Sequence, residues 1–212
     1  ESGRLVGVIT VDDVVDVIDE EAGDDLMKMG GVSEPDLYED VVDTTIARFT
    51  WLGVNLLTAV LASVVISLFD ATIEKVVALA VLMPIVASMG GNAGTQTLTV
   101  AVRSLAMKDL SEANAGRFVR KELIIGIING VLFAVLTGGV AWLWFDQTAL
   151  ALVIGAAMII NMVIAGLCGT LIPLGLERFN IDPAVASSVF LTTVTDVIGF
   201  FAFLGLAAIF LL

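Results

Sequence analysis

The sequence has 212 residues, 58% of them hydrophobic, and its mean hydropathy of +1.01 excludes an ordinary soluble domain. It has no histidine, which excludes an imidazole base and a histidine-ligated zinc site, and its one cysteine, Cys168, cannot form an intrachain disulfide. Residues 1–43 hold 14 of the 23 acidic residues and two of the ten basic residues, so they carry most of the net charge of −13. We therefore expect an acidic segment in water and a nearly neutral membrane domain. Such acidity argues against nucleic acid as a partner and favours cations.

The acidic segment begins with a short apolar, β-branched run, Leu5–Thr10, which predicts a buried strand. Thr10 or Asp12 can then cap a helix. One strand and one helix cannot form a core, so we expect the chain to begin inside a larger cytoplasmic domain. A second helix is expected over residues 36–48, leading into the first apolar run. Between the two helices, glycines and a proline are expected to break the segment into short pieces: Gly23, Gly30, Gly31 and Pro35.

The acids of this segment are candidate cation ligands. Like charges at helical spacing, such as Asp12 and Asp16, destabilise each other unless a positive charge lies between them. The segment has too few bases to neutralise its acids, so divalent cations are the expected counter-charge, and a solvated acidic face is the alternative. The candidate ligands are Asp12, Asp13, Asp16, Asp24 and Asp25.

Five apolar runs follow, each long enough to cross a bilayer as a helix, which takes about 20 residues. The predicted fold is an all-α integral membrane protein with five transmembrane helices in residues 49–212. Basic residues gather before the first run, between the second and third, and between the fourth and fifth, so the N-terminus is expected in the cytoplasm and the C-terminus outside. The runs are Phe49–Phe69, Val76–Val102, Leu123–Phe145, Gln147–Leu176 and Pro183–Leu212.

The second run contains Pro84, which should kink the helix, followed by a polar, glycine-rich stretch over residues 88–97. Polar groups at membrane depth are tolerated where they face protein or water. Close helix packing through the glycines is the alternative to a pore-lining role. The candidate pore-lining residues of this run are Gly90, Gly91, Asn92 and Gln96.

Asp196 is the only charged residue inside the five runs, and it lies near the middle of the last, where an aspartate costs about 2.5–3.5 kcal/mol to insert. Ser188, Thr192 and Asp196 follow one another at four-residue spacing and so form a polar stripe that Thr195 widens. The runs contain no Lys or Arg that could neutralise the carboxylate. An ion site is therefore favoured, and a protonated carboxyl with a structural or proton-relay role is the alternative.

The available ligands are all oxygens, which suit hard ions such as Mg²⁺, Ca²⁺ and Mn²⁺. Because Mg²⁺ sheds water reluctantly, we expect a pore with few carboxylates to hold it hydrated. Two chains around a twofold axis would set two Asp196 carboxylates against one divalent ion, which predicts a homodimer. A membrane enzyme is a poor fit, since paired intramembrane aspartates and histidine are missing from the sequence. A proton- or sodium-coupled divalent-cation carrier remains the alternative to a channel.

Motifs in two runs resemble the MgtE family of magnesium channels: Met83–Pro84, Gly90–Gln96, Arg103 and Thr192–Gly199. The stretch Gly3–Val14 likewise resembles the closing strand and helix of a CBS domain. The resemblance implies a homodimeric, Mg²⁺-selective pore in the cell membrane, lined by the second and fifth spans. It also implies that Asp196 faces the pore and recognises hydrated Mg²⁺.

The resemblance further implies three parts. Residues 1–35 match the tail of a CBS-like domain and an acidic linker, residues 36–48 match a connecting, or plug, helix, and residues 49–212 match the pore domain. In the family the plug helix closes the pore when cytoplasmic Mg²⁺ binds between it and the CBS domains. Since most of the CBS pair is missing from this sequence, closure is expected to be weakened here.

Overall fold

The computed structural model describes residues 9–32 and 40–212, and within these residues the secondary structure is entirely helical. Five of the helices, α2 and α4 to α7, are long and apolar enough to cross a membrane, which confirms the five predicted spans. The short α3 was not predicted. The helices are α1 (Val11–Met29), α2 (Val41–Ser67), α3 (Asp70–Lys75), α4 (Ala78–Ala106), α5 (Glu112–Phe145), α6 (Thr148–Arg178) and α7 (Pro183–Phe210).

Thr10 caps α1, as predicted. Its hydroxyl and its backbone N–H each donate to the Asp13 carboxylate at 2.7 Å, and these hydrogen bonds hold the pKa of Asp13 below its ordinary value. The predicted break at Gly23 is wrong, because a single glycine costs a helix only about 1 kcal/mol and α1 continues through it to Met29. The helix ends instead at Gly30 and Gly31, and Gly31 has a φ of +68° that suits glycine.

Two sequence predictions lie partly outside the described residues. The strand predicted over Leu5–Thr10 falls there almost entirely, as do residues 36–39 of the predicted connecting helix. Asp40 caps α2 by accepting a hydrogen bond from the Val42 N–H at 3.5 Å. From that cap α2 runs without interruption into the first span, so residues 41–48 are its first turns and not a separate helix.

The bundle is built around α6, which packs against α4, α5 and α7. The fully buried Leu82, Ile154 and Phe203 bring α4, α6 and α7 into one apolar core. Glycines let these helices approach closely: a Cβ added at Gly169 of α6 would lie 2.8 Å from the Gly94 carbonyl oxygen of α4. This close packing fixes the depth of α4 relative to α6 and α7.

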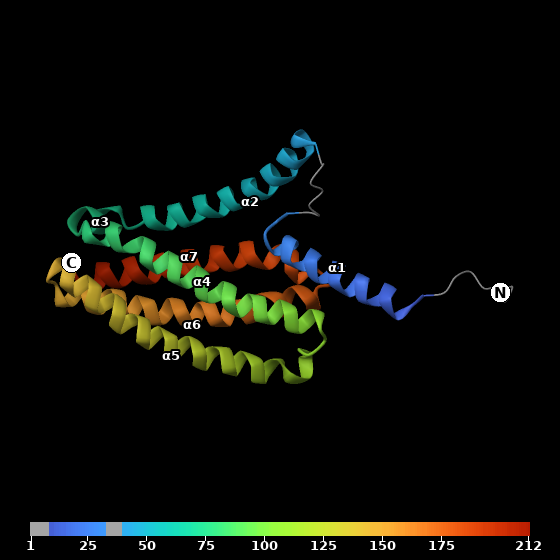
Figure 1. Ribbon diagram of the computed structural model, residues 1–212. Coiled ribbons are helices and arrows are strands. Elements are labelled where there is room, and N and C mark those ends of the chain that lie inside the picture. The colour runs from blue at the N-terminus through green and yellow to red at the C-terminus, as the bar shows by residue number, and fades with distance from the viewer. Residues whose placement is uncertain (1–8, 33–39) are drawn as a thin grey trace.

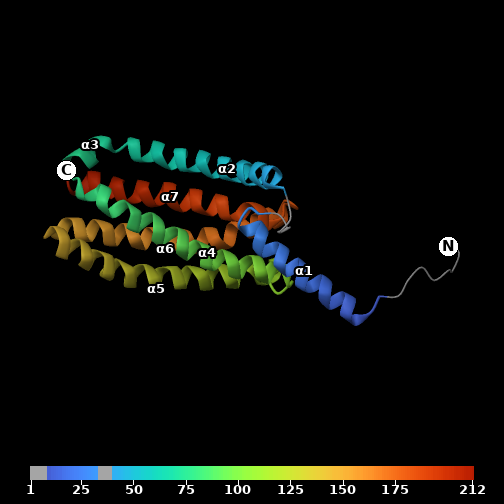
Figure 2. The same ribbon diagram turned by 45° about the horizontal axis from the view of Figure 1, so that its top comes forward.

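The spans run in alternating directions, so that their connections lie at two ends of the bundle (Figures 1 and 2). α2 lies along α7 at one edge and α5 lies at the opposite edge. α1 projects from the end that carries the α4–α5 and α6–α7 connections, and the C-terminus lies at the other end, beside α3 (Figure 1). The rings of Phe69 and Phe201 meet edge to face at 5.7 Å and join the end of α2 to α7.

Candidate ion site

Asp196 lies in the middle of α7 and is half-buried in the protomer. Within the part of the chain that the structure describes, its carboxylate has neither a hydrogen-bond donor nor a Lys or Arg partner. A carboxylate at membrane depth needs a proton, a cation or water to neutralise or solvate it. Among the described residues, the Asp196 carboxylate is therefore left available to a proton, a cation or water.

Contacts on either side of Asp196 place it level with the glycine motif of α4. Five residues before Asp196, Leu191 lies against Gly94 of α4: a Cβ added at Gly94 would be 2.8 Å from Cδ1 of Leu191. Three residues later, Gly199 lies against the Asn161 amide of α6, which also covers Gly90. The structure thus brings together the two motifs that the sequence analysis singled out.

A polar stripe on α4 is exposed in the protomer, and we call it the α4 polar face; it consists of Ser88, Asn92, Thr95 and Thr99. The Thr95 hydroxyl donates to the Gly91 carbonyl and the Thr99 hydroxyl to the Thr95 carbonyl, both at 2.8 Å. The Asn92 amide donates to the Ser88 hydroxyl oxygen at 3.3 Å. Because these donors bond within their own helix, oxygen lone pairs remain available to a hard cation or to its water shell.

The residues predicted to line a pore divide into two groups in the structure. Ser188 and Thr192 are half-buried like Asp196, and Gly91 has open space beside it. Thr195 is fully buried instead, and its hydroxyl donates to the Leu191 carbonyl at 3.0 Å. Gly90 is covered by the amide of α6, whereas Gln96 is exposed and also lines a side cavity between α4, α5 and α6.

That side cavity contains a carboxylate that the sequence analysis missed. Glu122 of α5 is 7% exposed, and the Thr97 hydroxyl donates to its Oε2 at 3.0 Å. Because Glu122 directly follows Lys121, the sequence places it with the charged residues that connect the second and third apolar runs. The signal that could have found it is the spacing of Glu122, Gly126 and Asn129, which places all three on one face of α5.

Asn161 is a second missed residue, because it lies alone in an apolar stretch of α6. It is fully buried, and its Nδ2 donates to the Val86 carbonyl at 2.7 Å. Among the described residues its Oδ1 has no partner. The side chain fills the space that Gly90 and Gly199 leave open, and so joins α4 and α7 through α6.

The predicted ligands of the acidic segment lie along α1. Asp12, Asp13 and Asp16 are exposed, Asp24 is half-buried, and the side chain of Asp25 lies outside what the structure describes. In the described residues, no three acidic or other metal-ligating side chains come together as a metal group.

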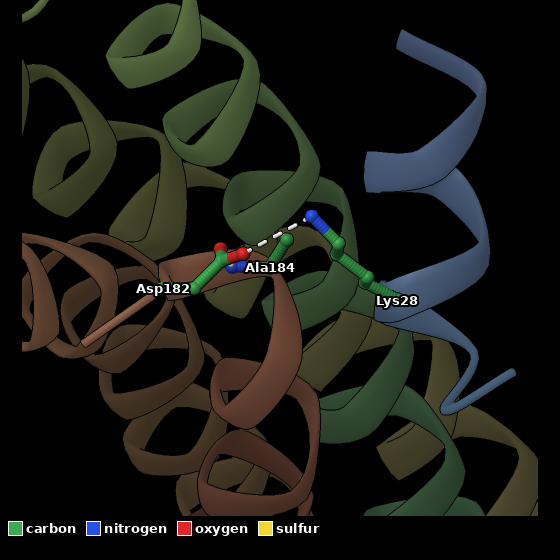
Figure 3. Close-up of polar contacts among 3 residues, drawn as sticks. All are labelled: Lys28, Asp182 and Ala184. Atoms are coloured by element: carbon green, nitrogen blue, oxygen red, sulfur yellow. Dashed lines mark hydrogen bonds and ion pairs between the residues drawn. The ribbon is translucent and has the colours of Figure 1, made fainter. Parts of the chain in front are cut away.

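The end of α1 docks on α7. Lys28 Nζ lies 3.4 Å from Oδ2 of Asp182, whose other oxygen accepts the Ala184 N–H at 2.9 Å and caps α7 (Figure 3). Next to this ion pair, Met29 packs on a buried apolar cluster from α4 and α7 that includes Leu98 and Leu191. α1 is therefore held at the end of the bundle where α7 begins.

A bundle with five apolar helices long enough to cross a bilayer is an integral membrane protein by class. Residues 83–206 match the family model of the MgtE divalent cation transporter, and the chain belongs to this family. It is therefore a multi-pass membrane protein.

Three curated relatives carry the name magnesium transporter MgtE. That of Thermus thermophilus is 36% identical over 214 residues, that of Enterococcus faecalis 35% over 208, and that of Bacillus subtilis 33% over 213. The alignments cover 98–100% of this chain and 46–47% of the relatives. The chain thus spans about half the length of the curated relatives that it matches.

Proposed function

We propose that this chain forms the pore of a magnesium transporter, in which hydrated Mg²⁺ enters the cytoplasm past the α4 polar face and is recognised by Asp196. The observation that carries the proposal is the Asp196 carboxylate, which lies at membrane depth without a partner among the described residues. The names of the three relatives support the choice of Mg²⁺. The same oxygen set suits Ca²⁺ and Mn²⁺, so these ions compete for the site.

The active unit in this proposal is a homodimer. The α4 polar face is exposed in the protomer, and lipid would leave its oxygens without partners. Two copies that turn these faces toward each other enclose a water-filled path. They also set two carboxylates of charge −1 against one Mg²⁺. One carboxylate per chain leaves most of the coordination sphere to water, which Mg²⁺ retains readily.

The basic residues support an orientation with α1 in the cytoplasm. They gather at the end of the bundle from which α1 projects (Figure 1), whereas Lys75 lies at the opposite end. The bases at the α1 end include Arg103, Lys108, Arg117, Arg120, Lys121 and Arg178.

Closure of the pore is assigned to α1 and its acids. Lys28 and Met29 hold α1 against the end of α7, within reach of the proposed cytoplasmic mouth. In the proposal, cytoplasmic Mg²⁺ neutralises acids of α1 together with ligands from outside the described residues, and this neutralisation keeps the helix docked. The continuous α2 then carries the movement into the first span, through the residues predicted as the connecting helix.

Cysteine accessibility tests the pore. In a Cys168→Ser background, Asn92→Cys on the α4 polar face should react with a charged, water-soluble thiol reagent, and Mg²⁺ should slow the reaction. Leu136→Cys is the matched control, because Leu136 is exposed on a span at the far edge of the bundle and faces lipid in this proposal. Leu136→Cys should react slowly or not at all, and an Asn92→Cys variant that reacts no faster than this control would contradict the assignment.

A carrier coupled to protons or sodium is the second candidate, and the buried Glu122 is the observation that favours it. A channel passes Mg²⁺ down the Mg²⁺ gradient whether or not a proton or sodium gradient is present, whereas a carrier requires a gradient of its coupling ion. Mg²⁺ flux measured with and without each gradient separates the two.

A further inference from the structure

The cavity between α4, α5 and α6 holds a buried charge that the proposed ion path does not use. Its volume is about 160 Å³, and Glu122 lines it together with Gln96 and Asn129. Gly166 of α6 lies close against α5, since a Cβ there would be 3.0 Å from the Glu122 carbonyl oxygen. The cavity thus combines a carboxylate with two amide side chains in a space large enough for water or an ion.

The surroundings of Glu122 supply one hydrogen bond and no counter-charge. The Thr97 hydroxyl donates to Oε2, and no ion pair to Glu122 exists within the described part of the chain. The other residues that face the cavity from α4, α5 and α6 are not titratable. The nearest bases in sequence, Arg120 and Lys121 on α5, are exposed, as is Arg103 on α4.

Charge balance selects the class of ligand. A buried carboxylate is costly unless it is paired or neutral, and a single hydroxyl donor offsets only part of that cost. One positive charge makes the site neutral, whereas a divalent ion would leave one uncompensated positive charge in the interior. Carboxylate, hydroxyl and amide oxygens are ligands for a small alkali-metal ion.

We propose that the Glu122 cavity binds one sodium ion, at a site separate from Asp196. Thr97 lies on α4, two residues before Thr99 of the α4 polar face, so the bound charge holds this part of α4 against α5 and α6. Any effect of the site on Mg²⁺ passage rests on the proposed function, whereas the binding itself does not.

The test measures thermal unfolding of the purified full chain, which requires no transport. At constant pH and ionic strength, Na⁺ is exchanged for choline. A sodium site predicts that each tenfold rise in Na⁺ above the dissociation constant stabilises the wild type by about 1.4 kcal/mol and leaves Glu122→Gln unchanged.

Asp146→Asn, in the turn between α5 and α6, is the matched control, and it should retain the response of the wild type. Equal sodium responses in the wild type and Glu122→Gln would overturn the proposal. If Glu122→Gln does not fold, Thr97→Val provides the second variant: it should shift the midpoint of the response, and an unshifted midpoint would also overturn the proposal. If the chain binds the ion at Glu122 but passes no Mg²⁺, the proposed function is refuted and the Glu122 site is not.

Discussion

A methyl group added at Gly90 tests the packing that sets the depth of Asp196. The Cβ of Gly90→Ala would lie 2.3 Å from Nδ2 of Asn161 and 2.7 Å from its Cγ and Oδ1. The amide has little room to retreat, because its Nδ2 is bonded to the Val86 carbonyl and Gly199 lies against it from α7. The substitution must therefore break the hydrogen bond, displace the helices, or both.

The expected cost follows from three contributions. Overpacking costs about 1–3 kcal/mol and the lost hydrogen bond about 0.5–1.5 kcal/mol, while replacing glycine by alanine in a helix returns about 1 kcal/mol. The free energy of unfolding should therefore fall by about 0.5–3.5 kcal/mol in a titration with denaturing detergent. Gly139→Ala is the control, since nothing lies within 4 Å of its Cβ position, and it should be neutral or slightly stabilising.

A second substitution identifies the cause. With Asn161→Ala in the same chain, the added methyl occupies space that the amide has left, so the two changes together should cost less than the sum of each alone. If Gly90→Ala proves as stable as Gly139→Ala, the close packing of α4 on α6 described above is wrong. If the two changes in the free energy of unfolding simply add, the methyl group of Gly90→Ala does not act through Asn161.

Two further predictions concern α1. In Thr10→Val the pKa of Asp13 should rise toward its ordinary value of 3.8, as measured by NMR titration, because the Thr10 hydroxyl is the largest cause of its lowering. Because the pKa of Asp13 is lower in the folded chain than in the unfolded chain, the capping box should stabilise α1 above pH 3.8 and lose this effect as pH falls through the folded pKa. An Asp13 pKa that is the same in Thr10→Val and the wild type would contradict the capping box. Lys28→Gln should speed hydrogen exchange at the end of α1 but change global stability by less than about 1 kcal/mol, because the ion pair is partly exposed. Lys75→Gln is its control, and equal exchange in the two variants would show that the pair does not hold α1.

The spans and the Thr10 cap could be predicted because each depends on local signals. An apolar run of bilayer length has one stable conformation in lipid, and a threonine before a helix has one favourable role. The predicted break at Gly23 failed because a local preference of about 1 kcal/mol does not interrupt a helix by itself.

The candidate site was only partly predictable, because burial depends on which helices meet. Sequence spacing placed Thr195 and Asp196 in one polar stripe, yet Thr195 is fully buried in the protomer and Asp196 only half-buried. Likewise, Glu122 directly follows an exposed lysine and is still buried, because α4 and α6 close over it. Such differences between neighbours depend on the direction in which each side chain leaves its helix.

Mg²⁺ uptake into liposomes that contain a Mg²⁺ indicator tests the central claim most directly. The wild type is compared with Asp196→Asn and with Asp146→Asn, a matched control in the turn between α5 and α6. At two pH values, we expect equal wild-type flux, unchanged flux for Asp146→Asn, and a loss of more than about tenfold for Asp196→Asn, which corresponds to about 1.4 kcal/mol of ion recognition. Flux that survives in Asp196→Asn would remove this carboxylate from the ion path and contradict the account.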